Sequence, residues 1–418
     1  MENTEETKPP ETLSTRSIMF ASVGAIAILI IFWGVVTLVR KPTIAMPSEV
    51  VYTIYASAPV QYEIGDFPIK AAQLALEQEQ AKPRNYRLRF IALDDSTLNG
   101  EWDEMRLREN LKIAIKDPTT IAFFGPILST AAKIAIPMLN VEGIPIISPT
   151  NTWPGLTKPG FSIDEPGRYY PTQKRNYVRF STTDELELTN AATWAQSLGM
   201  KTVSITGDKS LDPATTLFFS KRAEELGIKV NSRSFLEDNN TFQVAKNLIT
   251  EKPDLVYHLG ANSTLFTKFI RDLRRAGYRG SVMVSDSVLS QSLFDAATPE
   301  LEGVYVTSVS IPVDKLGNSL SERFIDAYKE RYKAAPDTSA GMAYESMKIL
   351  INAIDKSDHT REGIIRELFN THNFPSMFGS VTIDSNGDNV SGNIGGSIIK
   401  NGSAQYIGVI GHTPNLID

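Results

Sequence analysis

Two neighbouring stretches, Ile121-Ala-Phe-Phe-Gly-Pro-Ile-Leu-Ser-Thr130 and Ile144-Pro-Ile-Ile-Ser-Pro-Thr-Asn-Thr152, decide the fold of this chain. Each begins as a short apolar run and ends in small hydroxyl residues, with a helix-like segment between the two. Short apolar runs bounded by Gly and Pro are typical of buried parallel strands. In an open α/β sheet, ligands bind beyond the carboxyl ends of such strands. The two stretches therefore predict one binding site that contains Ser129, Thr130, Thr150 and Thr152.

Length and composition narrow the possible functions. A chain of 418 residues with 42% hydrophobic residues can build two domains of ordinary size. The net charge of -6 argues against nucleic acid as a main partner. Cysteine is absent, which excludes disulfides, zinc–thiolate sites and thiol catalysis. The four histidines are scattered without ligand spacing, so neither a metal nor another cofactor is expected.

The amino terminus contains a membrane-anchor signal. Residues 17–39 carry no charge and are long enough to cross a hydrocarbon core of about 30 Å. A cleaved signal peptide is the alternative, but its apolar core is usually only about 7–15 residues and its leader basic. We therefore expect a short cytosolic tail (1–16), an uncleaved single-pass anchor (17–39) and a linker (40–47). The folded body that follows is expected to be extracytoplasmic, although the positive charges flanking the apolar run are balanced.

The body alternates strand-like and helix-like segments joined by short connections, which indicates parallel sheets with helices on both faces. Strands are predicted first at 50–55, 87–93, 121–124 and 144–147, with helices at 69–78, 104–116 and 130–141. A Pro-, Gly- and Tyr-rich stretch at 153–176 interrupts this pattern, and its length predicts a functional loop or a flap. The alternation restarts near residue 177, as expected for a second α/β unit.

The end of the chain changes character. Helices are predicted at 319–333, 339–354 and 360–368, and antiparallel strands at 380–383, 396–400 and 406–410. The late helices have no sheet of their own nearby in sequence, so we expect them to cover the first domain. The stretch 384–388, Asp-Ser-Asn-Gly-Asp, resembles part of a calcium loop but lacks a downstream bidentate Glu. We interpret it as a turn built on Asn-Gly.

Short motifs along residues 48–418 resemble one known family, the substrate-binding proteins of branched-chain amino acid ABC transporters. These are Leu/Ile/Val-binding, type 1 periplasmic-binding proteins. No single motif is very specific, but their order and spacing are. The matching pieces include Ser57-Ala-Pro59, Asp94-Asp95, Phe124-Gly125-Pro126, Val178-Arg179-Phe180, Val284-Ser285-Asp286 and Tyr344-Glu345.

The resemblance implies a two-lobed type 1 periplasmic-binding fold, each lobe a parallel sheet flanked by helices, with three crossings between the lobes. Lobe 1 would hold 48–178 and 312–372, and lobe 2 would hold 179–311 and 373–418. The lobes would close over a small amino acid-like molecule. The implied partners are an ABC permease with its ATPase subunits.

The resemblance also assigns roles to the candidate site residues. Ser129, Thr130, Thr150 and Thr152 match positions that hold the ligand carboxylate, and hydroxyls at a helix start suit this role chemically. The alternative is that Ser129 is an N-cap and the two later threonines form a turn. Asp286 matches an acidic position that holds the ammonium, although a lone loop carboxylate is often simply solvated.

The second lobe departs from the family. A Tyr-Gly pair usually follows the strand that ends here at Gly207, but this chain has Lys209-Ser-Leu-Asp-Pro213. Asp208 and Asp212 are candidates to replace the missing tyrosine, or the ligand is not a simple α-amino acid. Candidates for the pocket wall or lid are Tyr62, Ile64, Trp153, Tyr169 and Tyr170, although aromatic residues in loops more often serve packing alone.

The sequence favours one of three function classes. Solute capture for an ABC permease needs no chemistry, because the ligand only favours the closed state. A ligand-sensing receptor would need a separate signalling partner, since the expected cytosolic tail is short. An enzyme is disfavoured because the sequence shows no phosphate loop, Gly-x-Ser-x-Gly motif or cysteine nucleophile.

Overall fold

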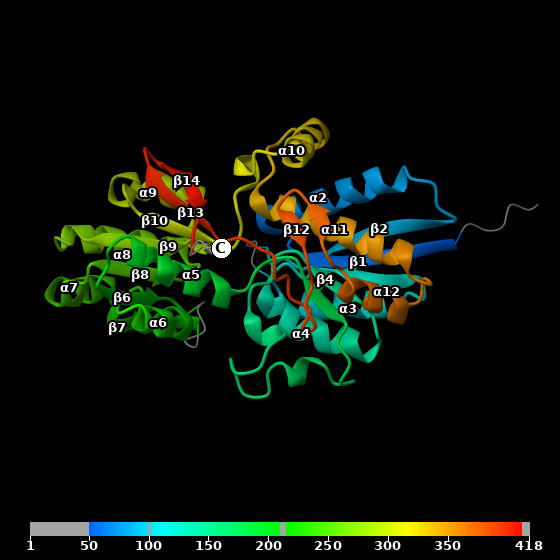
Figure 1. The fold of residues 1–418 in the computed structure, drawn as a ribbon, viewed down its shortest axis with the longest axis horizontal. Coiled ribbons are helices and arrows are strands. Elements are labelled where there is room, and N and C mark those ends of the chain that lie inside the picture. Colours follow the sequence, from blue (N-terminus) through cyan, green and yellow to red (C-terminus); the bar gives the residue numbers. More distant parts are fainter. Residues whose placement is uncertain (1–49, 99–101, 210–214, 412–418) are drawn as a thin grey trace, which may run out of the picture. The chain divides into compact units, whose positions relative to one another are not determined.

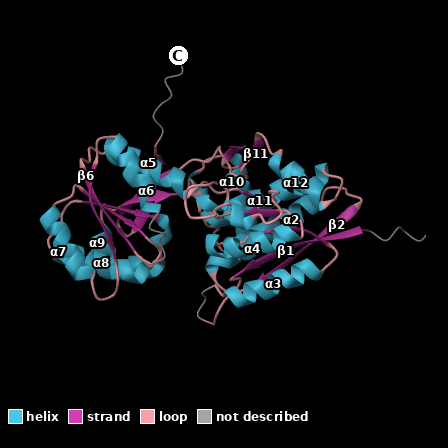
Figure 2. Ribbon diagram, turned by 90° about the horizontal axis from the view of Figure 1, so that it is seen from below, coloured by secondary structure: helices cyan, strands magenta, loops and turns pink. Residues whose placement is uncertain are grey.

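The computed structural model describes residues 50–98, 102–209 and 215–411. From Val51 onward the chain forms one compact unit built on two large sheets, each lying between layers of helices (Figures 1 and 2). This confirms the predicted α/β architecture of two lobes. The anchor predicted at 17–39, with the tail and linker around it, lies outside the described residues. In the part of the chain that the structure describes, no helix is long and apolar enough to cross a membrane.

The first sheet has five strands in the order β2-β1-β3-β4-β5. Its strands are β1 (Val50–Ala58), β2 (Tyr86–Asp94), β3 (Thr120–Phe124), β4 (Ile146–Ser148) and β5 (Tyr177–Arg179). The pairs β1–β3, β3–β4 and β4–β5 are parallel. Side chains alternate between the faces, so Phe123 enters one hydrophobic core while its neighbours Ala122 and Phe124 enter the other. Burial on both faces explains the continuous apolar runs.

Helices from distant parts of the sequence cover this sheet. One face packs against α3 (Glu104–Lys116) and α4 (Ser129–Val141). The other face packs against α2 (Glu63–Gln80), α10 (Ser319–Tyr332), α11 (Thr338–Lys356) and α12 (Arg361–Phe369). The return of the late helices to the first sheet confirms the expectation from sequence, and Figure 1 shows α11 beside α2.

The second sheet has the order β14-β13-β10-β9-β8-β6-β7. Its parallel strands are β6 (Thr202–Gly207), β7 (Lys229–Phe235), β8 (Leu255–Leu259), β9 (Ser281–Ser285) and β10 (Tyr305–Ser308). Two antiparallel strands complete it, β13 (Gly395–Lys400) and β14 (Ser403–Val409), as expected for the end of the chain.

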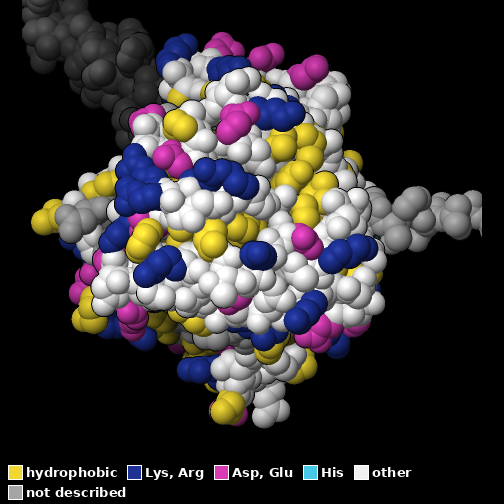
Figure 3. All heavy atoms as spheres, turned by 90° about the vertical axis from the view of Figure 1, so that its left-hand side faces the viewer, with side chains coloured by type: hydrophobic (Ala, Val, Ile, Leu, Met, Phe, Trp, Pro, Cys, Tyr) yellow, Lys and Arg dark blue, Asp and Glu magenta, His cyan; other side chains and the backbone are white. Residues whose placement is uncertain are grey.

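Within the described residues, five helices cover the second sheet. One core lies under α7 (Thr241–Glu251), α8 (Ser263–Arg275) and α9 (Gln291–Leu301). The opposite core lies under α5 (Asp184–Ser197) and α6 (Thr215–Glu225). Figure 3 shows the surface at this end of the molecule, where basic, acidic and apolar side chains are interspersed. Such a mixture is typical of a solvated protein surface.

The structure differs from the sequence prediction at three places. Helix α2 begins at Glu63 rather than Ile69, because Pro68 lies inside the helix instead of marking its start. Helix α9, which contains Pro299, was not predicted. A separate two-stranded sheet of β11 (Phe374–Ser376) and β12 (Gly379–Val381) packs into the first core. The prediction assigned residues from 373 onward to lobe 2, whereas this small sheet packs with lobe 1. The other lobe boundaries stay a prediction.

Candidate functional site

A cavity of about 410 Å³ lies at the carboxyl ends of strands from both sheets. We call it the cleft cavity. The first lobe contributes Leu128, Ser129, Thr130, Lys133, Thr152 and Trp153 to its wall. The second lobe contributes Asp184, Glu187, Leu188, Thr215, Leu259, Gly260, Ala261, Ser285 and Ser287. The position agrees with the general rule that ligands of α/β sheets bind beyond the carboxyl ends of parallel strands.

Ser129 lies at the amino-terminal end of α4, where this helix borders the cavity. It is the first residue of α4, and the N-cap position is Leu128, which makes no side-chain capping bond. Its Oγ instead accepts the backbone N–H groups of Thr152 (3.2 Å) and Trp153 (3.3 Å). With both lone pairs used, the Ser129 hydroxyl hydrogen has to point elsewhere. The first N–H groups of a helix also lack intrahelical partners, so this wall of the cavity suits an anion.

Thr150 has a different place from the other three hydroxyl residues. Its Oγ1 donates to the Ile127 carbonyl (2.7 Å), which also accepts Asn151 Nδ2 (3.0 Å). Ser148 Oγ donates to the neighbouring Pro126 carbonyl (2.9 Å). These bonds tie the end of β4 to the loop that leads into α4. Thr150 therefore fixes the loop that leads into α4, whereas Ser129, Thr130 and Thr152 line the cavity.

Trp153 forms part of the same wall and is held from behind by Glu165. The indole Nε1 donates to Glu165 Oε2 (3.0 Å), and Tyr169 Oη donates to Glu165 Oε1 (2.5 Å). Lys133 Nζ lies 3.6 Å from Glu165 Oε1 and 4.5 Å from the centre of the Trp153 ring. The long loop at 153–176 thus supplies both a wall residue and the carboxylate that orients it.

The opposite wall carries carboxylates. Asp184 and Glu187 lie in the first turn of α5, and Asp286 follows β9. Glu187 is only 4% exposed, and its Oε1 accepts the Thr307 hydroxyl (2.5 Å). Burial, and then the negative charge of Asp286, raises the pKa of Glu187 to about 8. Burial also raises the pKa of Asp286 to about 6 and raises the pKa of Asp184, which the Thr152 hydroxyl partly offsets.

Sequence reasoning selected Asp286 for the ammonium but missed Asp184 and Glu187 as site residues. Their signal was present, because positions i and i+3 at a helix start share one face. Asp286 itself lies between the wall residues Ser285 and Ser287 and interacts electrostatically with Asp184 and Glu187. Three carboxylates therefore gather on one side of the cleft cavity.

The other predicted site residues lie away from this wall. Asp208 is fully buried at the end of β6, and its Oδ2 accepts the backbone N–H of Asn262 (3.0 Å). It lies directly behind Gly260, since a Cβ added there would stand 2.3 Å from Asp208 Oδ2. Tyr62 and Ile64 lie at the start of α2, where Tyr62 Oη donates to Leu98 O (2.9 Å) and Ile64 is 50% exposed. The candidate Asp212 is outside the described residues.

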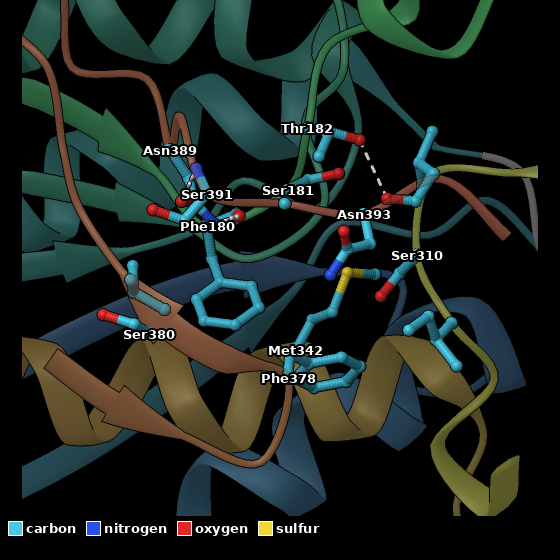
Figure 4. Close-up of a pocket in the computed structure, with 14 residues that line it drawn as sticks. Phe180, Ser181, Thr182, Ser310, Met342, Phe378, Ser380, Asn389, Ser391 and Asn393 are labelled. Carbon is cyan, nitrogen blue, oxygen red and sulfur yellow. Dashed lines mark hydrogen bonds between the residues drawn. The ribbon is translucent and has the colours of Figure 1, made fainter. Parts of the chain in front are cut away.

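A much smaller cavity lies where three crossing segments, 180–182, 309–311 and 389–393, run close together (Figure 4). Thr182 Oγ1 donates to the Val309 carbonyl (2.8 Å), and Asn389 Nδ2 donates to the Phe180 carbonyl (2.8 Å). The volume is about 20 Å³, which is enough for one water molecule but not for a solute. Of these two cavities, the cleft cavity is the candidate ligand site, because it has room for a solute and lies beyond the strand ends of both sheets.

Comparisons with known proteins agree with this geometry. A protein-family model described as "Periplasmic binding protein" matches residues 69–394. A leucine-binding protein from Thermotoga maritima is 23% identical, with a TM-score of 0.71 over 86% of this chain and 98% of that one. A Desulfitobacterium hafniense ABC-transporter substrate-binding protein in complex with Leu is 19% identical, with a TM-score of 0.71 over 85% of this chain and 100% of that one.

A third similar structure has a different ligand. It is a solute-binding protein from R. palustris in complex with benzoate, 18% identical, with a TM-score of 0.67 over 86% of this chain and 96% of that one. At these identities the likeness concerns the fold. No curated protein sequence matches the chain significantly. The family resemblance read from the sequence is confirmed.

Proposed function

Because the chain belongs to the periplasmic binding protein family, we propose that it captures an amino acid-like solute in the cleft cavity and delivers it to an ABC permease. The ligand would carry a carboxylate and an amine. The predicted anchor at 17–39 would keep the binding lobes attached to the membrane on its extracytoplasmic side.

The observation that carries this proposal is the opposite polarity of the two cavity walls. On one wall stand the start of α4, the hydroxyl of Ser129, and Lys133. On the other wall stand Asp184 and Glu187. A carboxylate is stabilised by the first wall and an ammonium by the second. A zwitterion that spans the cavity satisfies both walls at once.

The walls belong to different lobes, so binding of one ligand to both walls is coupled to lobe closure. Only when both lobes contact the same molecule does binding favour the closed arrangement. No bond of the ligand has to be broken for this function. The permease would then recognise the closed, loaded protein and receive the solute from it.

A thermal-shift screen of the described body with amino acids, simple carboxylates and simple amines tests the proposal. A ligand at about 100 times its Kd stabilises a binding protein by about 2.7 kcal/mol. We expect amino acids to raise the melting temperature and the compounds with only one of the two groups to raise it less. If no compound in the panel raises it, the proposed function is wrong.

A further inference from the structure

The cleft cavity has more acidic side chains than one ammonium needs. Asp184 and Glu187 line it, and Asp286 lies between two further lining residues. Among the described lining residues the only cation is Lys133, on the opposite wall and 3.6 Å from Glu165. A ligand with a single α-ammonium would leave at least one carboxylate of the second-lobe wall without a cationic partner.

Hydroxyl donors keep these carboxylates in place. Thr307 Oγ1 donates to Glu187 Oε1. The same Thr307 Oγ1 lies 3.1 Å from the hydroxyl oxygen of the buried Tyr257. The hydroxyls of Ser308 and Thr152 lower the pKa of Asp286 and Asp184 respectively, against the larger effect of burial. The acidic wall is therefore held together by a fixed hydrogen-bond network, although its members repel one another.

Repulsion among partly buried carboxylates costs stability unless a cation is placed between them. A metal ion does not fit this role, because no group of three His, Cys, Asp or Glu side chains within the described residues is arranged to hold one. An organic cation fits better. Apolar side chains beside the carboxylates, Leu188, Leu259 and Ala261, offer a surface for a methylene chain.

We propose that the ligand is a basic amino acid, and that Glu187 selects it by contacting the cationic group of its side chain. This inference rests on the proposed function of the same cavity. The α-carboxylate would lie at Ser129 and the start of α4, and the α-ammonium and the side-chain cation would share Asp184, Glu187 and Asp286. The ligand chemistry needed is a carboxylate and two positive charges joined by a short aliphatic chain.

Isothermal titration calorimetry with two matched ligand pairs tests the substrate class on the unmodified protein. Arginine is compared with citrulline, and lysine with norleucine, because each pair differs mainly in the side-chain charge. The cationic member should bind at least tenfold more tightly, which corresponds to about 1.4 kcal/mol. If the neutral member binds equally or more tightly, the substrate class is wrong although solute capture stands. If none of the four binds, the substrate class is wrong, and the thermal-shift screen decides whether solute capture stands.

The variant Glu187→Gln tests the selecting residue. It keeps the shape and an acceptor for Thr307 but removes the charge. We expect the arginine-to-citrulline affinity ratio to fall about tenfold while citrulline binding changes little. Glu185→Gln is the matched control, because Glu185 lies on the same helix, pairs with Lys158 at 3.3 Å and does not line the cavity. If Glu187→Gln weakens both ligands equally, Glu187 has only a structural role and the selection is disproved.

Discussion

Arg179 and Asp388 form a buried ion pair, with 2.7 Å between Arg179 Nε and Asp388 Oδ1. The same guanidinium donates to the Trp153 carbonyl (2.7 Å) and to Thr157 Oγ1 (2.5 Å). Asp388 belongs to the turn at 384–388, where the Asp384 carboxylate accepts the N–H groups of Asn386 and Asp388. One arginine thus joins the loop behind the cleft cavity to a segment near the end of the chain.

Removing the charge of Asp388 is expected to destabilise the protein strongly. Asp388→Asn leaves the fully buried Arg179 without its counter-charge, which typically costs about 3–5 kcal/mol. Urea denaturation measures the free energy of unfolding. Asp314→Asn is the control, because its ion pair with Lys315 is exposed and should contribute less than about 1 kcal/mol. Similar losses in the two variants would show that the buried pair is not important for stability.

Replacing Ser129 by alanine is expected to weaken ligand binding more than it weakens the fold. Ser129→Ala removes the acceptor of two loop N–H groups and the hydroxyl that faces the proposed carboxylate site. We expect a loss of about tenfold or more in affinity for the best ligand of the screen, and about 1 kcal/mol of stability. Ser339→Ala at the start of α11 is the control, and it should leave affinity unchanged. Equal affinities of Ser129→Ala and the unmodified protein would remove Ser129 from the site.

Regular elements of the fold were predictable because their signals are local. Helix α3 begins and ends at the predicted residues, since a polar cap, apolar periodicity and a terminating residue follow one another in sequence. The start of α2 was missed because Pro68 is usually a boundary but is tolerated inside this helix. Position-specific exceptions of this kind depend on tertiary packing, which overrides local propensity.

Sequence pattern predicted one wall of the site, whereas on the other wall only Asp286 was selected, through the family resemblance. The hydroxyl residues follow two parallel strands, and the carboxyl ends of parallel strands lie at the same edge of a sheet. The sequence pattern therefore predicted that Ser129 and Thr152 lie close together. Glu187 was missed because acidic residues in the first turn of a helix are common for electrostatic reasons alone. Arg179 and Asp388 are separated by 209 positions, and nothing local in either segment indicates the other. The partners of buried charges therefore came only from the structure.

Asp286 gives a prediction about the ligand amine. Asp286→Ala should weaken binding of an amino acid while leaving the same acid without its α-amino group largely unaffected. The physical reason is that Asp286 contributes negative charge to the wall that faces the ammonium. Calorimetry with the two ligands measures the difference. Unchanged affinity for the amino acid would mean that Asp286 is not part of the site.

The stability of the empty protein should fall as pH rises from about 6.5 to 8. Burial raises the pKa of Glu187 from 4.5 to about 8, so in this range the folded protein holds a proton that the unfolded chain has released. That stabilisation is complete below pH 4.5 and is lost as pH approaches the folded value. Nearby groups contribute little in this window, because Asp286 is mostly ionised at its start and the remaining proton release from His258 of the unfolded chain acts in the opposite direction. The pKa of Asp286 is raised only to about 6, and burial lowers the pKa of His258 from 6.5 to about 4.

Scanning calorimetry of the ligand-free protein at pH 6.5 and 8 measures this loss, which we expect to be on the order of 2 kcal/mol. Glu187→Gln cannot release the proton, so its melting temperature should change less over the same interval. Glu185→Gln, which keeps Glu187, should retain the full change.

A basic ligand should reverse the trend, because its cation favours ionised Glu187 and its affinity therefore rises with pH up to about 8. A melting temperature that does not fall between pH 6.5 and 8, in the unmodified protein, would show that Glu187 is already ionised in the empty cleft cavity.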